Sequence, residues 1–149
     1  MKQFLQASRE REVLSLLTGI AYTCVPAWYG ASQRDLKMDL IVPKYRAGHA
    51  PCPTILWLCG GAFSVVDRSI WLPQLMPLAE RGYIIASAEY RTSNEQPFPA
   101  ALEDVKAAVR FLKANAEMLC VDRNRICAAG ESAGATLACL LGTTGRRKE

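Results

Sequence analysis

The chain has 149 residues, half of them hydrophobic, and a formal net charge of +4. This length and composition predict a single globular domain and exclude a disordered or fibrous chain. Apart from the run RRKE at residues 146–149, which is typical of a solvated tail, charges of both signs are scattered along the chain. Neither nucleic-acid binding nor a membrane span is therefore expected.

The first third of the chain predicts one helix and two strands. We expect an amphipathic helix over residues 5–18, then strands over about 21–28 and 36–42 joined by a polar loop. In the second strand, apolar residues at every second position alternate with Lys37 and Asp39, which is typical of a half-exposed strand near a sheet edge. Val13–Tyr22 has the length of a signal-peptide core, but the mixed charges before it favour a mature chain.

Three later stretches are apolar without alternation, which is typical of central parallel strands: 54–59, 83–88 and 125–130. Helical segments separate and follow them, over 75–81, 99–116 and 133–141, with Gly142 expected to end the last. Strands that alternate with helices predict an α/β fold with right-handed crossovers. We expect a mostly parallel sheet with an antiparallel N-terminal edge.

The six cysteines and the single histidine bear on metal binding and on the cellular compartment. The cysteines are Cys24, Cys52, Cys59, Cys120, Cys127 and Cys139. None forms a C-x-x-C pair, so no metal site is expected. Cys59, Cys127 and Cys139 lie in apolar runs and are expected to pack as small hydrophobic groups, which favours a reducing cytoplasm.

The motif G-x-S-x-G occurs once, at residues 130–134, as Gly130, Glu131, Ser132, Ala133 and Gly134. It follows a predicted strand and opens a predicted helix, the context in which this motif presents a nucleophilic serine. The two glycines allow a tight turn, and the helix N-terminus favours developing negative charge at Ser132.

A glycine loop, LCGGAF at residues 58–63, follows another predicted strand and lies on the same sheet edge. Its small residues allow the backbone N–H groups of Gly61 and Ala62 to turn inward, and Ala133 offers a third donor for an oxyanion. An ordinary Gly-Gly turn is the alternative for this loop alone. Two such motifs on one edge, in this order, favour an acyl-transfer site.

The stretches LWLCGGAF, YIIASAEYR, FPAALEDVKAAVRFLKANA and VDRNRICAAGESAGA resemble the α/β-hydrolase esterases and lipases. The branch is that of hormone-sensitive-lipase-like carboxylesterases, acetyl-xylan and feruloyl esterases and kynurenine formamidase. The resemblance runs from about Leu36 to Leu141. It implies that Ser132 is the nucleophile, that Gly61, Ala62 and Ala133 form the oxyanion hole, and that a small-molecule ester is cleaved through an acyl-enzyme without metal or cofactor.

Two departures from this family pattern stand out. Cys59 occupies the place where the family usually has a histidine before the glycine loop; that histidine mostly braces the loop, so we expect a tuning change. Cys59 as a nucleophile is disfavoured because no base is visible. Beyond Ser132 the chain has no histidine, and its only acid is Glu149, although the family order is Ser, then Asp or Glu, then His.

The only histidine, His49, precedes the strand at 54–59 and is expected at the opposite edge of the sheet, roughly 20 Å from Ser132. The chain therefore resembles the N-terminal half of a hydrolase, a single domain over 1–149 truncated after the helix that follows Ser132. By itself it is expected to be nearly inactive.

Two other hypotheses remain open. The chain is a shortened hydrolase that serves as a binding or assembly module and self-associates through the open edge of strand 125–130, or a separate polypeptide completes its site. The acyl and alcohol groups, and ester against amide, stay undecided. Phe63 and Trp71 are candidates for an acyl or aryl site, with a place in the core as the equal alternative.

Overall fold

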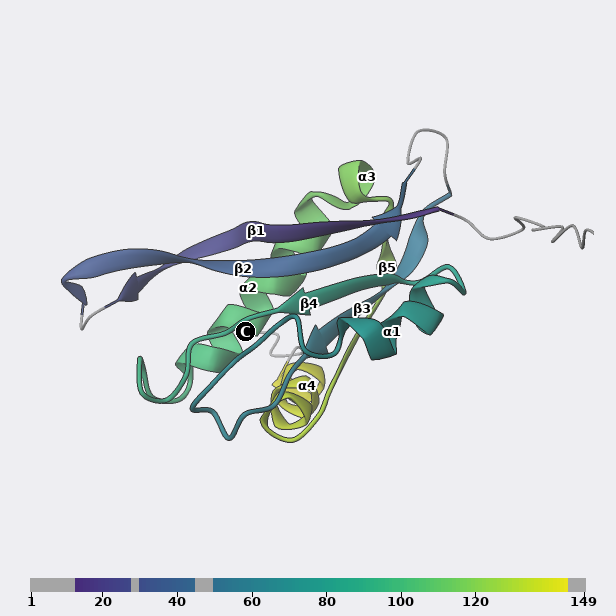
Figure 1. Cartoon of the computed structure of the whole chain (residues 1–149). Coiled ribbons are helices and arrows are strands. Elements are labelled where there is room, and N and C mark those ends of the chain that lie inside the picture. The colour runs from purple at the N-terminus through teal and green to yellow at the C-terminus, as the bar shows by residue number, and fades with distance from the viewer. Residues whose placement is uncertain (1–12, 28–29, 45–49, 145–149) are drawn as a thin grey trace, which may run out of the picture.

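A computed structural model describes residues 13–27, 30–44 and 50–144, which form one five-stranded sheet flanked by helices (Figure 1). The elements in chain order are β1 (Leu14–Ala27), β2 (Ser32–Pro43), β3 (Cys52–Leu58), α1 (Leu72–Ala79), β4 (Ile84–Ala88), α2 (Ala100–Ala114), α3 (Ala116–Leu119), β5 (Val121–Gly130) and α4 (Ala133–Thr144).

The strand order is β1-β2-β4-β3-β5. β3 pairs in parallel with β4 and β5, whereas β1 pairs antiparallel with β2, and β2 with β4. The predicted mixed sheet, with its antiparallel N-terminal edge, is thus confirmed.

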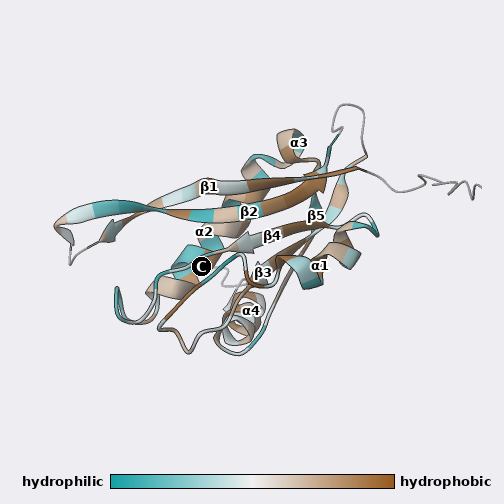
Figure 2. Cartoon of the chain, in the orientation of Figure 1, coloured by the Kyte–Doolittle hydropathy of each residue, from teal (hydrophilic) through white to brown (hydrophobic). Residues whose placement is uncertain are grey.

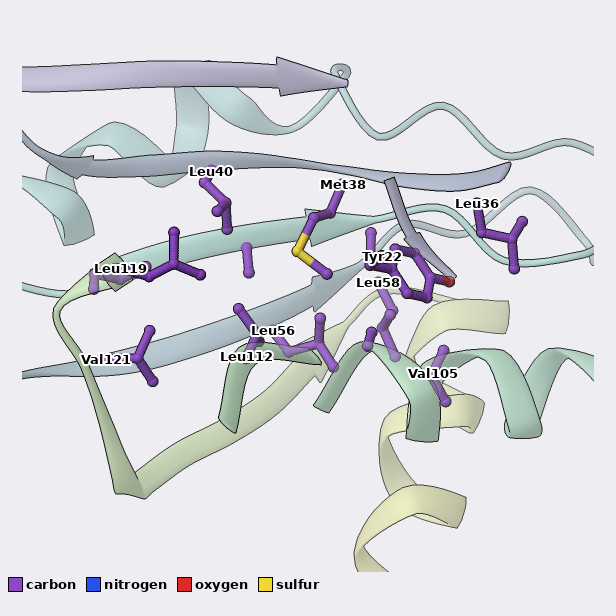
Figure 3. Close-up of a cluster of buried hydrophobic side chains, with 14 of the residues drawn as sticks. Tyr22, Leu36, Met38, Leu40, Leu56, Leu58, Val105, Leu112, Leu119 and Val121 are labelled. Atoms are coloured by element: carbon purple, nitrogen blue, oxygen red, sulfur yellow. The ribbon is translucent and has the colours of Figure 1, made fainter. Parts of the chain in front are cut away.

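Both faces of the central strands are covered, so the core has two parts. On one face, sheet residues such as Met38 and Leu56 pack against Val105 and Leu112 of α2, and α4 adds Leu137 (Figure 3). On the other face, a smaller cluster joins the sheet to α1: Ile41, Ile55, Leu72, Leu75, Ala79 and Ile85. Apolar residues accordingly dominate the strands and hydrophilic ones the far end of the β1–β2 hairpin (Figure 2).

The predicted helix over 5–18 is wrong for its second half, because β1 begins at Leu14; residues 5–12 lie outside the described part of the chain. Leu14 and Leu17, three residues apart, share a helix face, whereas in β1 they pack on opposite faces of the sheet, and pairing with β2 overrides the helical spacing. Gly19 takes φ +69° where the register shifts between Leu17 and Ile20, which marks an irregularity in the hairpin. β2 begins at Ser32, inside the stretch that was expected to be loop.

β2 also differs from expectation in burial. Asp39, predicted to be exposed beside Lys37, is only 3% exposed. Its carboxylate accepts hydrogen bonds from the Gly19 amide at 2.7 Å and from Nε of Arg68 at 2.8 Å. A charged side chain from a distant loop thus covers this face of the strand, and a paired charge is tolerated where a lone one is not.

Smaller differences concern helix ends and cysteines. α4 continues through Gly142 to Thr144. Cys59 is buried as expected, but Cys127 and Cys139 are exposed, because β5 pairs on one side only and Cys139 lies on the outer face of α4. No helix in the described ranges is long and apolar enough to cross a membrane.

Candidate active site

The turn between β5 and α4 holds Ser132 in a left-handed backbone conformation with φ +51°. Non-glycine residues rarely adopt this conformation, and where they do so they often mark functional sites. The carbonyl of Glu131 accepts hydrogen bonds from the amides of Gly134 and Ala135, which starts the helix directly after the serine. Ser132 is exposed at the helix N-terminus, as the motif predicts.

The two motif glycines let the turn pack directly on the end of β3. A Cβ built on either Gly130 or Gly134 would overlap the carbonyl oxygen of Leu58. The amide of Glu131 also donates to this oxygen, at 3.4 Å. Any side chain at Gly130 or Gly134 would therefore push helix α4 away from the strand.

The glycine loop after β3 turns sharply at three consecutive residues. Gly61, Ala62 and Phe63 have φ of +133°, +53° and +57°. The carbonyl of Gly61 accepts hydrogen bonds from the amides of Ser64 and Val65, which closes the turn. Positive φ at three consecutive residues turns the backbone sharply just after β3, at the place where the sequence predicts an oxyanion hole.

Three amides at this edge have no hydrogen-bond acceptor in the described part of the chain. Within the described residues, the N–H groups of Gly61, Ala62 and Ala133 donate no hydrogen bond to another residue. They are the same three donors that the sequence predicts for an oxyanion.

The side chain of Glu131 joins the two motifs, because its Oε1 accepts a hydrogen bond from the amide of Gly60 at 2.7 Å. Its carboxylate fills the space where a side chain at Gly60 would lie. The structure thus brings the residues of both motifs together at the carboxyl ends of β3 and β5. His49 lies outside the described residues.

Cys59 is buried, and burial raises the pKa of its thiol above the ordinary value. The thiol is therefore protonated near neutral pH and is a poor nucleophile. The backbone carbonyl oxygen of Cys59 accepts a hydrogen bond from the hydroxyl of Tyr90 at 2.6 Å. Sequence reasoning gave Tyr90 no role, although the residue lies just past β4 in the stretch YIIASAEYR.

A cavity of about 400 Å³ lies beside the glycine loop. Its walls are Gly60, Gly61, Val65, Asp67, Ile70, Trp71, Gln74 and Glu131. Trp71 lines this cavity and also contacts Trp57, with ring centroids 5.6 Å apart. Phe63 packs instead against Tyr90, with ring centroids 6.5 Å apart, and Ser132 is not part of the cavity wall.

A larger cavity of about 780 Å³ lies away from this site, between α2, β5 and α4. Four cationic side chains line it, Lys106, Arg110, Lys113 and Arg123, above an apolar floor. Among the described residues, no three His, Cys, Asp or Glu side chains lie close enough to hold a metal ion.

A serine turn at the end of a parallel strand, beside a glycine loop on the neighbouring strand, is the arrangement of the α/β-hydrolase fold. Bacterial heroin esterase superimposes with a TM-score of 0.70 at 29% identity, over 94% of this chain and 41% of that one. Esterase 2 from Thermogutta terrifontis shares the fold with a TM-score of 0.67 at 24% identity, over 87% of this chain and 43% of that one.

The sequence profile of the BD-FAE family matches residues 38–149, and the chain belongs to this family, within the carboxylic ester hydrolases. Esterase LipC of Mycobacterium tuberculosis is 36% identical over 95 residues, which make up 63% of this chain and 24% of LipC. Esterase LipI of the same organism is 34% identical over 98 residues, 65% of this chain and 31% of LipI. The chain thus spans a quarter to a third of the length of these curated relatives.

Proposed function

We propose that this chain carries the nucleophile and the oxyanion hole of a serine esterase. The observation that carries the proposal is the left-handed Ser132, exposed at the N-terminus of α4, together with the amides of Gly61, Ala62 and Ala133, which have no acceptor among the described residues. The esterases among the relatives support the same reaction class.

In the proposed reaction, Oγ of Ser132 attacks the ester carbonyl carbon while a base takes the hydroxyl proton. The carbonyl oxygen becomes an oxyanion that the three amides stabilise; removing one such donor costs about 10²–10³ in kcat elsewhere. The alcohol leaves with a proton, and water then releases the acid from the acyl-serine. No metal or cofactor takes part in this scheme.

The base is the part that this chain does not supply in our proposal. The family places it on a histidine after the serine, and no histidine follows Ser132. Loss of the base in a serine protease costs about a millionfold in kcat. We therefore expect the chain alone to hydrolyse p-nitrophenyl acetate no faster than its Ser132→Ala variant; clear serine-dependent turnover would show that a base is present.

The nucleophile itself is tested by covalent trapping with a p-nitrophenyl phosphonate. Trapping needs a single attack rather than turnover, so it is run at alkaline pH, where hydroxide takes the hydroxyl proton in place of the missing base: an Oγ–P bond forms to Ser132 and the bond to p-nitrophenolate breaks. Intact-mass analysis should show one adduct on the wild-type chain and none on Ser132→Ala. The matched control is Ser64→Ala, because Ser64 directly follows the glycine loop. This variant must still form the adduct. Equal labelling of wild type and Ser132→Ala would refute the assignment.

A second candidate function is assembly with another polypeptide, including one that completes the site. β5 pairs only with β3 among the described strands, and open strand edges accept a further strand. Self-association of identical chains is the form that sedimentation velocity tests: a discrete dimer at micromolar concentration supports it, and a monomer refutes it.

The proposed location is a reducing cytoplasm, because no two cysteines of the described residues form a disulfide. Small ester substrates are the proposed partners, with neither nucleic acid nor membrane. Fractionation of the native host would test the location, and recovery from an oxidising compartment would refute it.

A further inference from the structure

We propose that Glu131 and Tyr90 form a two-sided clamp on the peptide group between Cys59 and Gly60. They thereby position the glycine loop at residues 58–63, called the oxyanion loop from this point on. This proposal rests on the proposed function, in which Gly61 and Ala62 of that loop supply the donors. Both clamp residues act through the backbone and are positioning residues.

The clamp holds both ends of one peptide group. On one side, the hydroxyl of Tyr90 donates to the carbonyl oxygen of Cys59 at 2.6 Å. On the other side, the amide of Gly60 donates to Oε1 of Glu131 at 2.7 Å. Because the two groups belong to one planar unit, these bonds fix its position and its rotation, and so the direction in which the next two N–H groups leave.

Each clamp residue is itself held firmly. Tyr90 is 1% exposed, and burial raises the pKa of its hydroxyl, so it stays protonated and donates. The amide of Glu131 donates to Leu58, and its carbonyl starts helix α4. The residue beside the nucleophile therefore contacts the strand, the oxyanion loop and the helix at once.

The clamp also gives a reason why Cys59 can stand where the family usually has a loop-bracing histidine. A buried thiol makes only weak hydrogen bonds. The bracing that the side chain of Cys59 does not provide comes here from a phenol and a carboxylate acting on its backbone. The shape of the site agrees, because the carboxylate of Glu131 fills the space beside Gly60 that a side chain there would need.

The direct test is amide NMR on the intact 149-residue chain, which needs no catalytic activity. The Gly60 amide should exchange with solvent about tenfold faster in Glu131→Ala than in wild type, with its proton shifted upfield. Glu131→Gln keeps an acceptor oxygen and should restore most of both effects. Tyr90→Phe should instead move the carbonyl carbon of Cys59, and both substitutions should move the Gly61 and Ala62 amides.

The matched controls remove the same groups far from the loop: Glu117→Gln on α3 and Tyr83→Phe directly before β4. They should leave the resonances of residues 59–62 unchanged. A Gly60 amide with the same exchange rate and shift in wild type and Glu131→Ala overturns the clamp.

The reactive consequence is measured by the trapping rate of Ser132 with the p-nitrophenyl phosphonate. Glu131→Ala and Tyr90→Phe should each slow adduct formation about tenfold, and Glu131→Gln less. Unchanged rates in both variants refute the positioning role. If wild type and Ser132→Ala both stay unlabelled, the proposed nucleophile fails, whereas the amide data still decide the clamp.

Discussion

Adding a single methyl group at Gly134 should have the opposite effect to adding one at Gly142, eight residues further along the same helix. In Gly134→Ala, the new Cβ would overlap the carbonyl oxygen of Leu58 and lie 2.5 Å from its carbonyl carbon and 2.8 Å from the oxygen of Cys59. All three are backbone atoms of the strand end, so the helix must shift. At Gly142, nothing lies within 4 Å of the built Cβ.

The magnitudes follow from two opposing terms. Alanine is favoured over glycine in a helix interior by up to about 1 kcal/mol, and this is the expected gain in the unfolding free energy of Gly142→Ala. Overpacking costs about 1–3 kcal/mol and exceeds that gain at Gly134. With a urea m-value of about 2 kcal/mol/M, a net loss of 2 kcal/mol lowers the midpoint by about 1 M.

Equilibrium urea unfolding by circular dichroism measures both variants against wild type. The reasoning requires a lower midpoint for Gly134→Ala and an equal or higher one for Gly142→Ala, with unchanged m-values. If Gly134→Ala is as stable as wild type, the close approach of α4 to β3 is not a feature of the folded protein.

Three other contacts give predictions that are checked on the same protein. Asp104→Ala should lower the unfolding free energy by about 3 kcal/mol in urea, because it leaves Arg91 buried without the carboxylate that binds it at 2.7 Å; a loss below about 1 kcal/mol contradicts this. Partial burial raises the pKa of Glu95, but hydrogen bonds from Thr92 and Arg34 bring it below the ordinary value. Glu95 therefore stabilises the fold above about pH 4.3, where the unfolded carboxyl ionises, and this contribution is lost as pH falls through the lower folded pKa. The stability gap between wild type and Glu95→Gln should be present at pH 7 and absent near pH 3, and a gap that persists at pH 3 has another cause. A maleimide should label three thiols of the folded chain quickly and three only after unfolding, as intact mass shows; a fourth fast label contradicts the burial. The fast ones are Cys24, Cys127 and Cys139.

The sheet and the two motifs could be predicted because their signals are local. A strand such as 54–59 is apolar at every position after Thr54, which indicates burial on both faces. Gly130 and Gly134 bracket the serine at a fixed spacing, so the turn is encoded in five residues. The first half of β1 could not be predicted, because Leu14 and Leu17 have a helical spacing and only pairing with β2 places them in a strand.

The residues that join the motifs could not be found from the sequence. Glu131 is 71 positions from Gly60, and Tyr90 is 31 positions from Cys59. Neither spacing carries a signal, since the contact exists only after β3, β4 and β5 have paired. The same holds for Asp39, whose period-two position predicts exposure until Arg68 covers it.

The geometry of the candidate site depends on one strand end. The carbonyl of Leu58 lies against Gly130 and Gly134 and accepts the amide of Glu131, and the oxyanion loop begins at the next residue. β3 is paired with β4 on one side and β5 on the other, which holds this strand end in place. A displacement of α4 from Leu58 therefore moves Ser132 and Ala133 relative to the end of β3. For this reason Gly134→Ala should slow phosphonate trapping at Ser132 even without urea, where the variant is fully folded. Equal trapping rates in Gly134→Ala and wild type would show that the serine is positioned independently of β3.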